Sequence, residues 1–251
     1  MSRRVLITGG ASGIGLAMGQ GFAAAGYRVW VSDVDALALT RLPPDWRSSR
    51  VDVTDADAMA DLFTCVATDW GGLDVLCANA GTAGPTAPVQ DVTPQDWRAC
   101  LAVNLDGAFL AAKHAAPMMQ RQRSGAMILT SSTAGQHGYP NRAPYAAAKW
   151  AVIGLMKTLA MELGPHGVRA NAICPGAVEG PRMEAVLARE AAVKGMTRDA
   201  VYAGYAAGTS LRRFVTAREI ADMAVFLASD AARMVSGQAI AVDGHTVNPD
   251  P

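Results

Sequence analysis

The chain has 251 residues, with 22 basic and 22 acidic side chains, so its formal net charge at neutral pH is zero. Binding to nucleic acid or to an anionic membrane surface needs an excess or a patch of basic residues, and this balance excludes the excess. Hydrophobic residues make up 51% of the sequence, which is ample for the core of one α/β domain of this length. We therefore expect a single domain over residues 1–251 without a nucleic-acid partner.

Short apolar runs alternate with longer helical stretches along the chain. The expected strands are residues 4–8, 28–32, 50–53, 75–78, 126–131, 168–174 and 238–242. The expected helices are residues 13–25, 56–69, 94–122, 144–163 and 217–229. Continuous apolar strands separated by helices indicate a parallel sheet that is covered on both faces. With right-handed crossovers the predicted fold class is α/β, a doubly wound Rossmann sheet of seven strands with helices on both faces.

Residues 180–209 form a long insertion between the sixth strand and the last helix. The segment has a helical pattern but is rich in alanine and glycine. Such a segment beside the carboxyl ends of the strands is a candidate substrate lid.

The cysteines and the apolar segments bear on metal sites and on location. Cys65, Cys77, Cys100 and Cys174 have spacings that fit no zinc or haem pattern, so no metal is expected. Charges such as Lys149 interrupt the apolar segments, so no membrane span is expected. No long apolar region precedes a small-residue cleavage site near the N-terminus, which predicts a cytoplasmic protein.

The first strand runs directly into a glycine-rich turn, residues 8–15, and then into a helix. Glycines allow a tight turn there and let backbone N–H groups approach a pyrophosphate at the helix N-terminus. The alternative is an ordinary strand-to-helix turn that happens to be rich in glycine. The candidate cofactor-binding residues of this loop are Gly9, Ser12, Gly13, Ile14 and Gly15.

Asp33 ends the second strand, eighteen positions after Gly15. An acid at this place can accept hydrogen bonds from the hydroxyls of an adenosine ribose and repels a 2′-phosphate. The loop contains no lysine or arginine, and Val34 and Asp35 follow Asp33. These features predict NAD rather than NADP, although Asp33 could also be a solvated turn residue.

Tyr145 and Lys149 are four positions apart within an expected helix, so they share one face. A nearby positive charge favours the phenolate and lowers the pKa of a tyrosine. Such a phenol can give a proton to a carbonyl or take one from an alcohol. Taken alone, this spacing is a common accident on helices.

Several motifs in order resemble those of the short-chain dehydrogenase/reductase family in its single-domain form, over nearly the whole chain. The matching residues are Thr8-Gly9 with Gly13 and Gly15, Asp52-Val53, Asn79-Ala80-Gly81, Asn104, Ser131-Ser132, Tyr145 with Lys149, Pro175-Gly176 and Val242-Asp243-Gly244. Ser132 precedes Tyr145 by the spacing typical of the family, which selects Ser132 over Ser131. The combination is far more specific than any single motif.

The resemblance implies roles for these residues. Tyr145 would be the general acid/base, Lys149 would hold the nicotinamide ribose and lower the pKa of Tyr145, and Ser132 would orient the reacting oxygen. Asn104 would keep a water that links Lys149 to solvent. The remaining implied cofactor contacts are Asp52, Val53, Asn79, Ala80, Gly81, Pro175, Gly176 and Val178.

The sequence thus predicts an NAD-dependent oxidoreductase that interconverts a secondary alcohol (a polyol, sugar or hydroxy acid) and its ketone. Two alternatives remain, an NADPH-linked 3-oxoacyl reductase and a protein that senses NAD(H) without catalysis. The resemblance also implies a homotetramer formed through alanine-rich helices and the last strand.

Two positions depart from the family pattern, and the substrate region is open. Gly180 stands where a threonine often contacts the nicotinamide carboxamide, and His245 stands where a second glycine is common near a subunit contact. The expected substrate pocket draws on residues 84–88, on the lid segment and on the residues after Ser132. Its polar candidates are Gln136, His137 and Tyr139. Arg182 is a further candidate and would meet an anionic or polyhydroxylated substrate. The alternative is that Arg182 and the other three cations of the lid segment form a solvated helix face.

Overall fold

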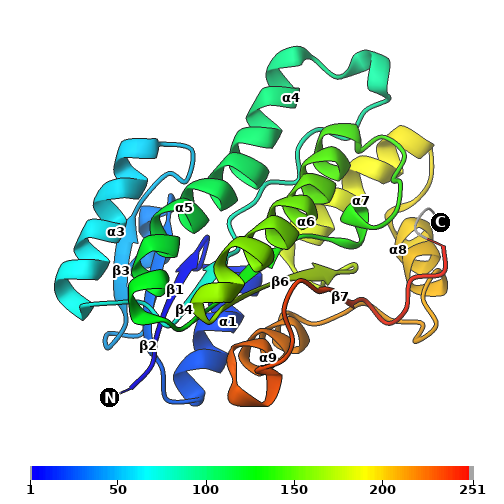
Figure 1. Ribbon diagram of the computed structural model, residues 1–251. Coiled ribbons are helices and arrows are strands. Elements are labelled where there is room, and N and C mark those ends of the chain that lie inside the picture. The colour runs from blue at the N-terminus through cyan, green and yellow to red at the C-terminus, as the bar shows by residue number, and fades with distance from the viewer. Residues whose placement is uncertain (1, 249–251) are drawn as a thin grey trace.

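A computed structural model describes residues 2–248, and its centre is a seven-stranded parallel sheet in the order β3-β2-β1-β4-β5-β6-β7 (Figure 1). The strands are β1 (Arg4–Thr8), β2 (Arg28–Asp33), β3 (Arg47–Arg50), β4 (Val75–Ala78), β5 (Gly125–Thr130), β6 (Val168–Pro175) and β7 (Ala239–Val242). The strand order reverses between β1 and β4, which is where doubly wound sheets bind ligands. The predicted fold class is confirmed.

Helices cover both faces of the sheet (Figure 1). They are α1 (Gly13–Ala24), α2 (Ala36–Leu39), α3 (Ala56–Trp70), α4 (Pro94–Leu101), α5 (Gly107–Gln122), α6 (Ala143–Leu163), α7 (Pro181–Lys194), α8 (Arg198–Ala207) and α9 (Ala217–Ala228). Buried residues of α3, α5 and α6 form one core, and buried residues of α1 and α9 form the other. The sheet is therefore a middle layer between two helical layers.

The strands supply alternate side chains to the two cores. Leu6 of β1 belongs to the α3–α5–α6 core, whereas its neighbours Val5 and Ile7 belong to the α1–α9 core. In β5, Met127 and Ile128 divide in the same way. This follows from the two-residue period of a strand, and burial on both faces explains why these strands read as continuous apolar runs.

The short helix α2 was not predicted, and two further elements differ from the sequence prediction. The third strand is Arg47–Arg50 rather than residues 50–53, because this edge strand is polar and largely exposed, while the apolar Val51 and Val53 are buried just after it. The helix expected over residues 94–122 is divided by a π-helical turn, Ala102–Asp106, between α4 and α5. The hydrophobic pattern continues through this turn, so it does not reveal the change in hydrogen bonding.

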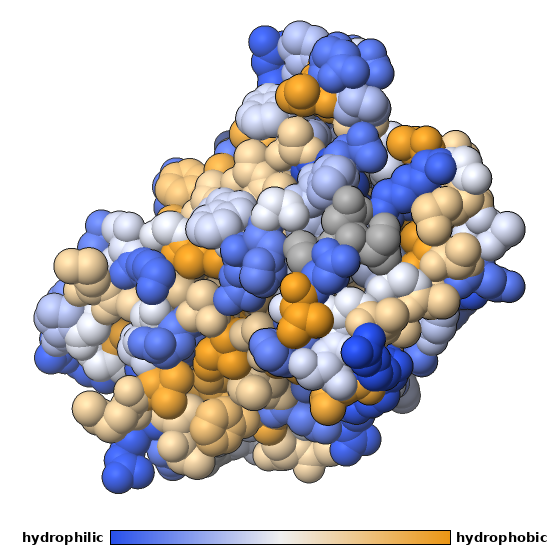
Figure 2. Space-filling model, turned by 90° about the vertical axis from the view of Figure 1, so that its right-hand side faces the viewer, coloured by the Kyte–Doolittle hydropathy of each residue, from blue (hydrophilic) through white to orange (hydrophobic). Residues whose placement is uncertain are grey.

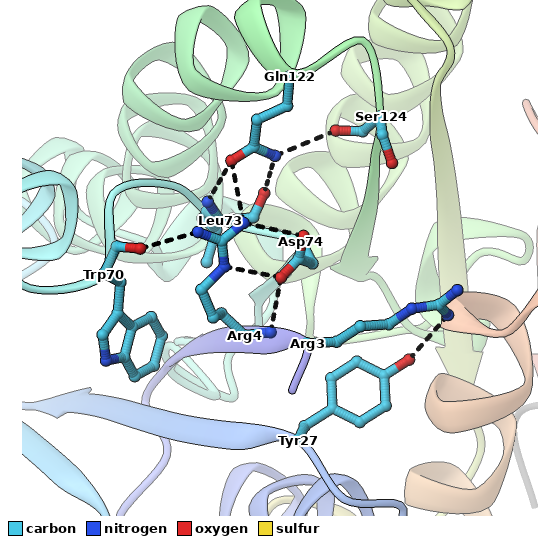
Figure 3. Close-up of polar contacts among 8 residues, drawn as sticks. All are labelled: Arg3, Arg4, Tyr27, Trp70, Leu73, Asp74, Gln122 and Ser124. Carbon is cyan, nitrogen blue, oxygen red and sulfur yellow. Dashed lines mark hydrogen bonds and ion pairs between the residues drawn. The ribbon is translucent and has the colours of Figure 1, made fainter. Parts of the chain in front are cut away.

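The end of the sheet opposite the carboxyl ends of the strands is tied together by Arg4 (Figure 3). Its Nε donates to Asp74 Oδ2 at 2.8 Å, and its Nη1 donates to the Trp70 carbonyl at 2.9 Å. Gln122 at the end of α5 accepts from the Leu73 N–H at 2.7 Å and donates to the Leu73 carbonyl at 2.7 Å. These contacts fix the starts of β1 and β4 relative to α5.

The segment of residues 180–209 consists mainly of α7 and α8, which pack on each other around their own small cluster. Its buried members are Leu187, Ala191 and Val201, together with Phe214. The segment is thus a helical unit at one end of the sheet (Figure 1), which agrees with the helical pattern of its sequence.

Candidate active site

A cavity of about 590 Å³ lies at the carboxyl ends of the strands, beside the point where the strand order reverses. Its lining includes Gly9, Ser12, Gly13, Ile14, Gly15, Asp33, Asp52, Val53, Asn79, Ala80, Gly81, Ser132, Tyr145, Lys149, Pro175, Gly176 and Val178. These are all of the candidate site residues except Asn104, whose neighbour Val103 reaches the lining. The structure therefore brings together residues that come from β1, β2, β4, β5, α6 and β6.

The glycine-rich turn places the N-terminus of α1 in the cavity wall. Gly9 and Gly13 have φ angles of 61° and 52°, in the left-handed region that favours glycine. A Cβ at Gly15 would lie 2.2 Å from the Gly9 carbonyl oxygen, so α1 packs directly on the turn. Ser12 makes no capping hydrogen bond with its side chain. The first N–H groups of α1 are thus available to an anion such as a pyrophosphate, which the missing Cβ atoms allow to approach closely.

Asp33 and Asp52 line the cavity on the side of β2 and β3. Asp33 Oδ2 accepts from the Ala11 N–H at 3.0 Å, and its Oδ1 accepts from the Asp35 N–H at 3.1 Å. Asp33 therefore positions the glycine-rich turn and still has lone pairs for ribose hydroxyls. Asp52 Oδ1 accepts from both the N–H and the hydroxyl of Thr54, at 2.9 and 2.8 Å, and Oδ2 accepts no hydrogen bond from the described residues.

Asn79 joins three strands at the floor of the cavity. Its Nδ2 donates to the carbonyl oxygens of Thr8 and Gly9 at 3.2 and 3.0 Å, and its Oδ1 accepts from Thr130 Oγ1 at 3.2 Å. A Cβ at Gly9 would lie 2.7 Å from Ala80 Cα, so the ends of β1 and β4 approach closely. These contacts hold residues 79–81 in the cavity wall, beside the glycine-rich turn.

Tyr145 and Lys149 lie on the first two turns of α6 and face the end of β5. Lys149 is 2% exposed, and its Nζ donates to the Thr130 carbonyl at 2.8 Å and lies 5.7 Å from the centroid of the Tyr145 ring. Ser131 donates to the Lys149 backbone carbonyl at 2.8 Å. Ser131 thus holds α6 against β5, whereas Ser132 is the neighbour whose hydroxyl reaches Tyr145.

The charges around Tyr145 favour its phenolate. Burial raises the pKa of Tyr145, but the positive charges of Lys149 and Arg182, the hydrogen bond from Ser132 and the charge of Arg142 lower it, and the net pKa is below the usual value of 10.0. Burial also lowers the pKa of Lys149 below 10.5, against the opposing effect of Tyr145. The phenol is therefore suited to proton exchange with an alcohol or a carbonyl.

Asn104 lies inside the π-helical turn, under the cavity rather than in its lining. Its Nδ2 donates to the carbonyl oxygens of Thr82 and Cys100, at 3.0 and 2.9 Å. Its Oδ1 is buried and has no hydrogen-bond partner among the described residues. A Cβ at Gly81 would lie 2.8 Å from this oxygen and 3.4 Å from Lys149 Nζ. The unsatisfied acceptor beside the lysine fits the bound water that the resemblance implies.

Arg142 is a cavity-lining residue that the sequence analysis did not single out. It is only 7% exposed, and its guanidinium carbon lies 4.8 Å from the centroid of the Tyr145 ring. A signal was available, since Arg142 is three residues before Tyr145 and residues at this spacing share a helix face. From the sequence alone, however, an arginine at the start of a helix is predicted to be exposed, because the residues that bury it are not known.

The polar candidates for the substrate pocket have other neighbours. Gln136, His137 and Tyr139 are not in the cavity lining, and the Tyr139 hydroxyl lies 2.8 Å from Thr133 Oγ1. Residues 84–88 are also outside the lining. Arg182 is in the lining, and its Nη1 donates to the Gly81 carbonyl at 3.3 Å.

The two departures from the family pattern have local explanations. Gly180 has a φ of 134° and directly precedes α7, so a threonine would be strained there. His245 Nδ1 lies 2.7 Å from Ser210 Oγ, which gives the ring a partner within its own chain.

Neither a metal cluster nor a membrane span is found in residues 2–248. The described residues contain no group of three or more His, Cys, Asp or Glu side chains arranged to hold a metal ion. No helix in this range is both long enough and apolar enough to cross a bilayer.

The sequence and the structure were compared with known proteins. Residues 9–245 match the family model described as enoyl-(acyl carrier protein) reductase. The cis-4-hydroxycyclohexanecarboxylate dehydrogenase of Sinomonas cyclohexanicum is 38% identical over 248 residues, which cover 96% of this chain and 95% of that protein. The 3-oxoacyl-(acyl-carrier-protein) reductase of Thermotoga maritima is 36% identical and is matched over 96% of both chains.

A solved structure gives the same result. The structure of NAD+-bound xylitol dehydrogenase aligns with a TM-score of 0.94 and 31% sequence identity, and it covers 96% of this chain and 98% of the other. The matched family model, the identities and the almost complete coverage agree with the motifs and with the sheet order. The chain therefore belongs to the short-chain dehydrogenase/reductase family of oxidoreductases.

Proposed function

We propose that the protein is an NAD-dependent dehydrogenase that interconverts a secondary alcohol and its ketone. The observation that carries this proposal is the buried Tyr145–Lys149 pair beside Ser132, at one end of a cavity whose other end is the glycine-rich turn. Two of the similar proteins support the substrate class, since their names specify a hydroxycyclohexanecarboxylate and xylitol, which are both alcohols.

In the proposed reaction the residues of this chain orient the alcohol and move its proton. The glycine-rich turn and Asp33 would hold NAD, which would supply the acceptor for the hydride of the carbinol carbon. The Tyr145 phenolate takes the hydroxyl proton, and Ser132 donates a hydrogen bond to the reacting oxygen. Lys149 stabilises the phenolate by its charge, and Asn104 holds a water that returns the proton from this end of the cavity to solvent. Reduction of the ketone uses the same groups in reverse.

The preference for NAD rests on Asp33. Its carboxylate lines the cavity at the end of β2, where it would accept hydrogen bonds from the adenosine ribose and repel a 2′-phosphate. Val34, the next residue, also lines the cavity and carries no positive charge that could hold such a phosphate. The relatives include a 3-oxoacyl reductase, so an NADPH-linked reductase is the second candidate.

The test is turnover of a panel of secondary alcohols, followed by nicotinamide absorbance with NAD and with NADP. We expect kcat/KM to be at least about 10-fold higher with NAD, because a charge repulsion of about 1.4 kcal/mol gives this factor.

Tyr145→Phe should reduce kcat by at least about 100-fold and leave NADH binding nearly unchanged. An efficiency with NADP equal to that with NAD would refute the cofactor proposal, and a Tyr145→Phe variant that binds no NADH would make Tyr145 structural.

We also propose that the protein acts in the cytoplasm as a homotetramer. Large apolar side chains on α6 are exposed, namely Trp150 at 53% and Met161 at 80%, and Phe109 on α5 is 47% exposed. The side of the molecule that carries α7 and α8 mixes hydrophilic and hydrophobic residues (Figure 2). Burial of apolar helix faces between subunits would stabilise the assembly. A monomeric mass in light scattering would contradict it.

A further inference from the structure

The end of the cavity that holds Tyr145 is positively charged. Three cationic side chains line the cavity, Arg142, Lys149 and Arg182, and all three lower the pKa of Tyr145. The acids Asp33 and Asp52 also line the cavity, but Asp33 ends β2 and Asp52 follows β3, at the other end of the cavity. The third lining acid, Glu179, is exposed and also acts on Arg213, so it offsets only part of the charge of the three cations. A substrate at Tyr145 therefore meets hydrogen-bond donors with a net positive charge.

Arg142 is held in place by its neighbours, but not all of its N–H groups have a hydrogen-bond acceptor. Its Nη2 donates to the Ala83 carbonyl at 3.1 Å, and its Nη1 lies 3.7 Å from Glu190 Oε1, which is too long for a hydrogen bond. Its Nε is buried without a hydrogen-bond partner among the described residues. Since a guanidinium has five N–H donors, this buried group retains capacity for an acceptor.

Glu190 offsets only part of the positive charge at this end of the cavity. Its two carboxylate oxygens accept from the Tyr205 hydroxyl at 2.8 and 3.0 Å, and Oε2 lies 3.9 Å from Lys194 Nζ. Two cations thus share one carboxylate, and Glu190 itself is outside the cavity lining. The network holds Arg142 from the side of α7 and α8 and leaves the charge facing the cavity.

Arg182 provides the second guanidinium, from the first turn of α7. It is exposed, it donates to the Gly81 carbonyl at 3.3 Å, and it forms no ion pair with any residue that the structure describes. Neither arginine is paired with an acid at hydrogen-bond distance, although guanidinium groups commonly bind carboxylates in a bidentate way.

We propose that Arg142 and Arg182 bind a carboxylate of the substrate, so that the substrate is a hydroxy acid whose hydroxyl reacts at Tyr145. This inference rests on the proposed function. A neutral polyol or sugar would leave the positive charge of Arg142 and Arg182 uncompensated. A carboxylate offers four lone-pair sites and the opposite charge, so it matches both guanidinium groups.

The test compares acids with neutral analogues of the same skeleton. The probes are 4-hydroxycyclohexanecarboxylate and 3-hydroxybutanoate, each with its methyl ester, assayed with NAD. We expect kcat/KM to be about 100-fold higher for at least one acid than for its ester, because hydrogen bonds to a charged group contribute factors of this size. Equal values for each acid and its ester, or higher values for the esters, would overturn the proposal.

Variants separate the binding role from a structural role. Arg142→Met should reduce kcat/KM for the acid about 100-fold and for the ester less than about 5-fold, and Arg142→Lys should fall between these values. Glu190→Gln removes the negative neighbour and keeps the volume, so it should not weaken acid turnover if Arg142 binds the acid. If Arg142→Met and Glu190→Gln reduce kcat/KM equally, for both the acid and the ester, the Arg142–Glu190 ion pair has only a structural role.

Arg182 is exposed, so replacing it tests the proposal without changing a buried residue. Arg182→Gln should reduce acid turnover about 10-fold, because this side chain is exposed and its charge is partly screened. Arg189→Gln on the same helix is the matched control, since Arg189 is also exposed and, among the described residues, its side chain donates only to the Ala185 carbonyl within α7. An unchanged acid preference in Arg182→Gln would remove Arg182 from the proposed site.

A binding measurement distinguishes failure of this inference from failure of the proposed function. Cyclohexanecarboxylate has the carboxylate but no reacting hydroxyl, and its binding to the NADH-loaded protein can be measured by calorimetry. We expect binding that Arg142→Met weakens. Turnover of neutral alcohols alone, without binding of this acid, overturns the inference and leaves the proposed function intact. Binding of the acid without turnover of any alcohol overturns the proposed function on which the inference rests.

Discussion

The phenol of Tyr145 lies among three cations, and each can be removed separately. Burial raises the pKa of Tyr145, while Lys149, then Arg182, and then Arg142 lower it, so that the net pKa is below 10.0. Lys149 and Arg142 also support the local structure, since Lys149 Nζ donates to Thr130 and Arg142 donates to Ala83. Arg182 is exposed and is therefore the cation best suited to a test of this electrostatic effect.

Alcohol oxidation should depend on pH through this phenol. The reaction needs the phenolate, so kcat/KM should rise as the pH passes the lowered pKa of Tyr145. Arg182→Gln removes a positive charge that favours the phenolate, so the rising limb should move to higher pH. The measurement is the pH profile of kcat/KM for a neutral secondary alcohol with NAD.

The control for this prediction is Arg189→Gln, which should keep the profile of the unmodified protein. A rising limb that moves to lower pH in Arg182→Gln, or does not move, would mean that Arg182 does not act on the reacting phenol.

The candidate site was predictable from the sequence as far as short motifs and spacing extend. The spacing of Tyr145 and Lys149 is informative only together with the other family motifs, which also select Ser132, and the structure brings the three residues to one end of a cavity. Arg142 was missed because its contacts, Ala83 and Glu190, are distant from it in the sequence. The ring stack of Arg142 on Tyr145 is likewise a tertiary contact that helix spacing permits but does not require.

At the scale of elements, two glycines of α1 differ in whether their surroundings leave space for a Cβ atom. A Cβ at Gly15 would lie 2.2 Å from the Gly9 carbonyl oxygen and 2.7 Å from Gly10 Cα, and these backbone atoms cannot move without changing the turn. A Cβ at Gly21 would lie 3.4 Å from Val225 Cγ2 and 3.6 Å from Ala221 Cβ, which are contacts that a small shift can accommodate.

Gly15→Ala should therefore destabilise the protein by about 2 kcal/mol or more through overpacking, and should abolish measurable NADH binding. Gly21→Ala on the same helix should be neutral or stabilising, by up to about 1 kcal/mol, because alanine favours the helix. The measurements are thermal unfolding and a titration of NADH fluorescence. Normal NADH binding by Gly15→Ala would contradict the close packing of α1 on the turn.

The elements that the sequence misplaced have a physical explanation. β3 pairs with β2 through polar residues such as Arg47 and Arg50, because an edge strand has little buried surface and so needs no apolar run. The π-helical turn at Ala102–Asp106 leaves the apolar pattern continuous but changes the hydrogen bonds around Asn104. The strands with buried faces, in contrast, were identified within about one residue of their observed bounds.

For the whole molecule, the Arg4–Asp74 ion pair joins the start of β1 to the start of β4, at the end of the sheet away from the active site (Figure 3). Burial raises the pKa of Asp74, but the hydrogen bonds and the charge of Arg4 lower it, and the net pKa is below 3.8. Because the folded pKa is depressed, this pair contributes stability above the unfolded pKa of Asp74, and the contribution is lost as the pH falls through the folded pKa.

Asp74→Asn should lower the free energy of unfolding by about 2 kcal/mol at pH 7, because Arg4 loses charged hydrogen bonds at a partly buried site. The difference from the unmodified protein should shrink below about pH 4, when the carboxyl becomes protonated. Denaturant unfolding at several pH values measures this. Asp230→Asn is the control, since its exposed pair with Arg3 should contribute little. A difference that stays constant down to pH 2 would contradict the assigned cause.

The contacts that connect α7 to the rest of the molecule have a consequence for its motion. α7 contacts the residues around Tyr145 through the hydrogen bond from Arg182 to the Gly81 carbonyl and through the long Arg142–Glu190 ion pair. The α7–α8 pair has its own apolar cluster, separate from the two main cores. Elements with few contacts to the main core open more readily than buried ones. The amides of α7 and α8 should therefore exchange with deuterated solvent faster than those of α6, and a ligand that bridges the two arginines should slow that exchange.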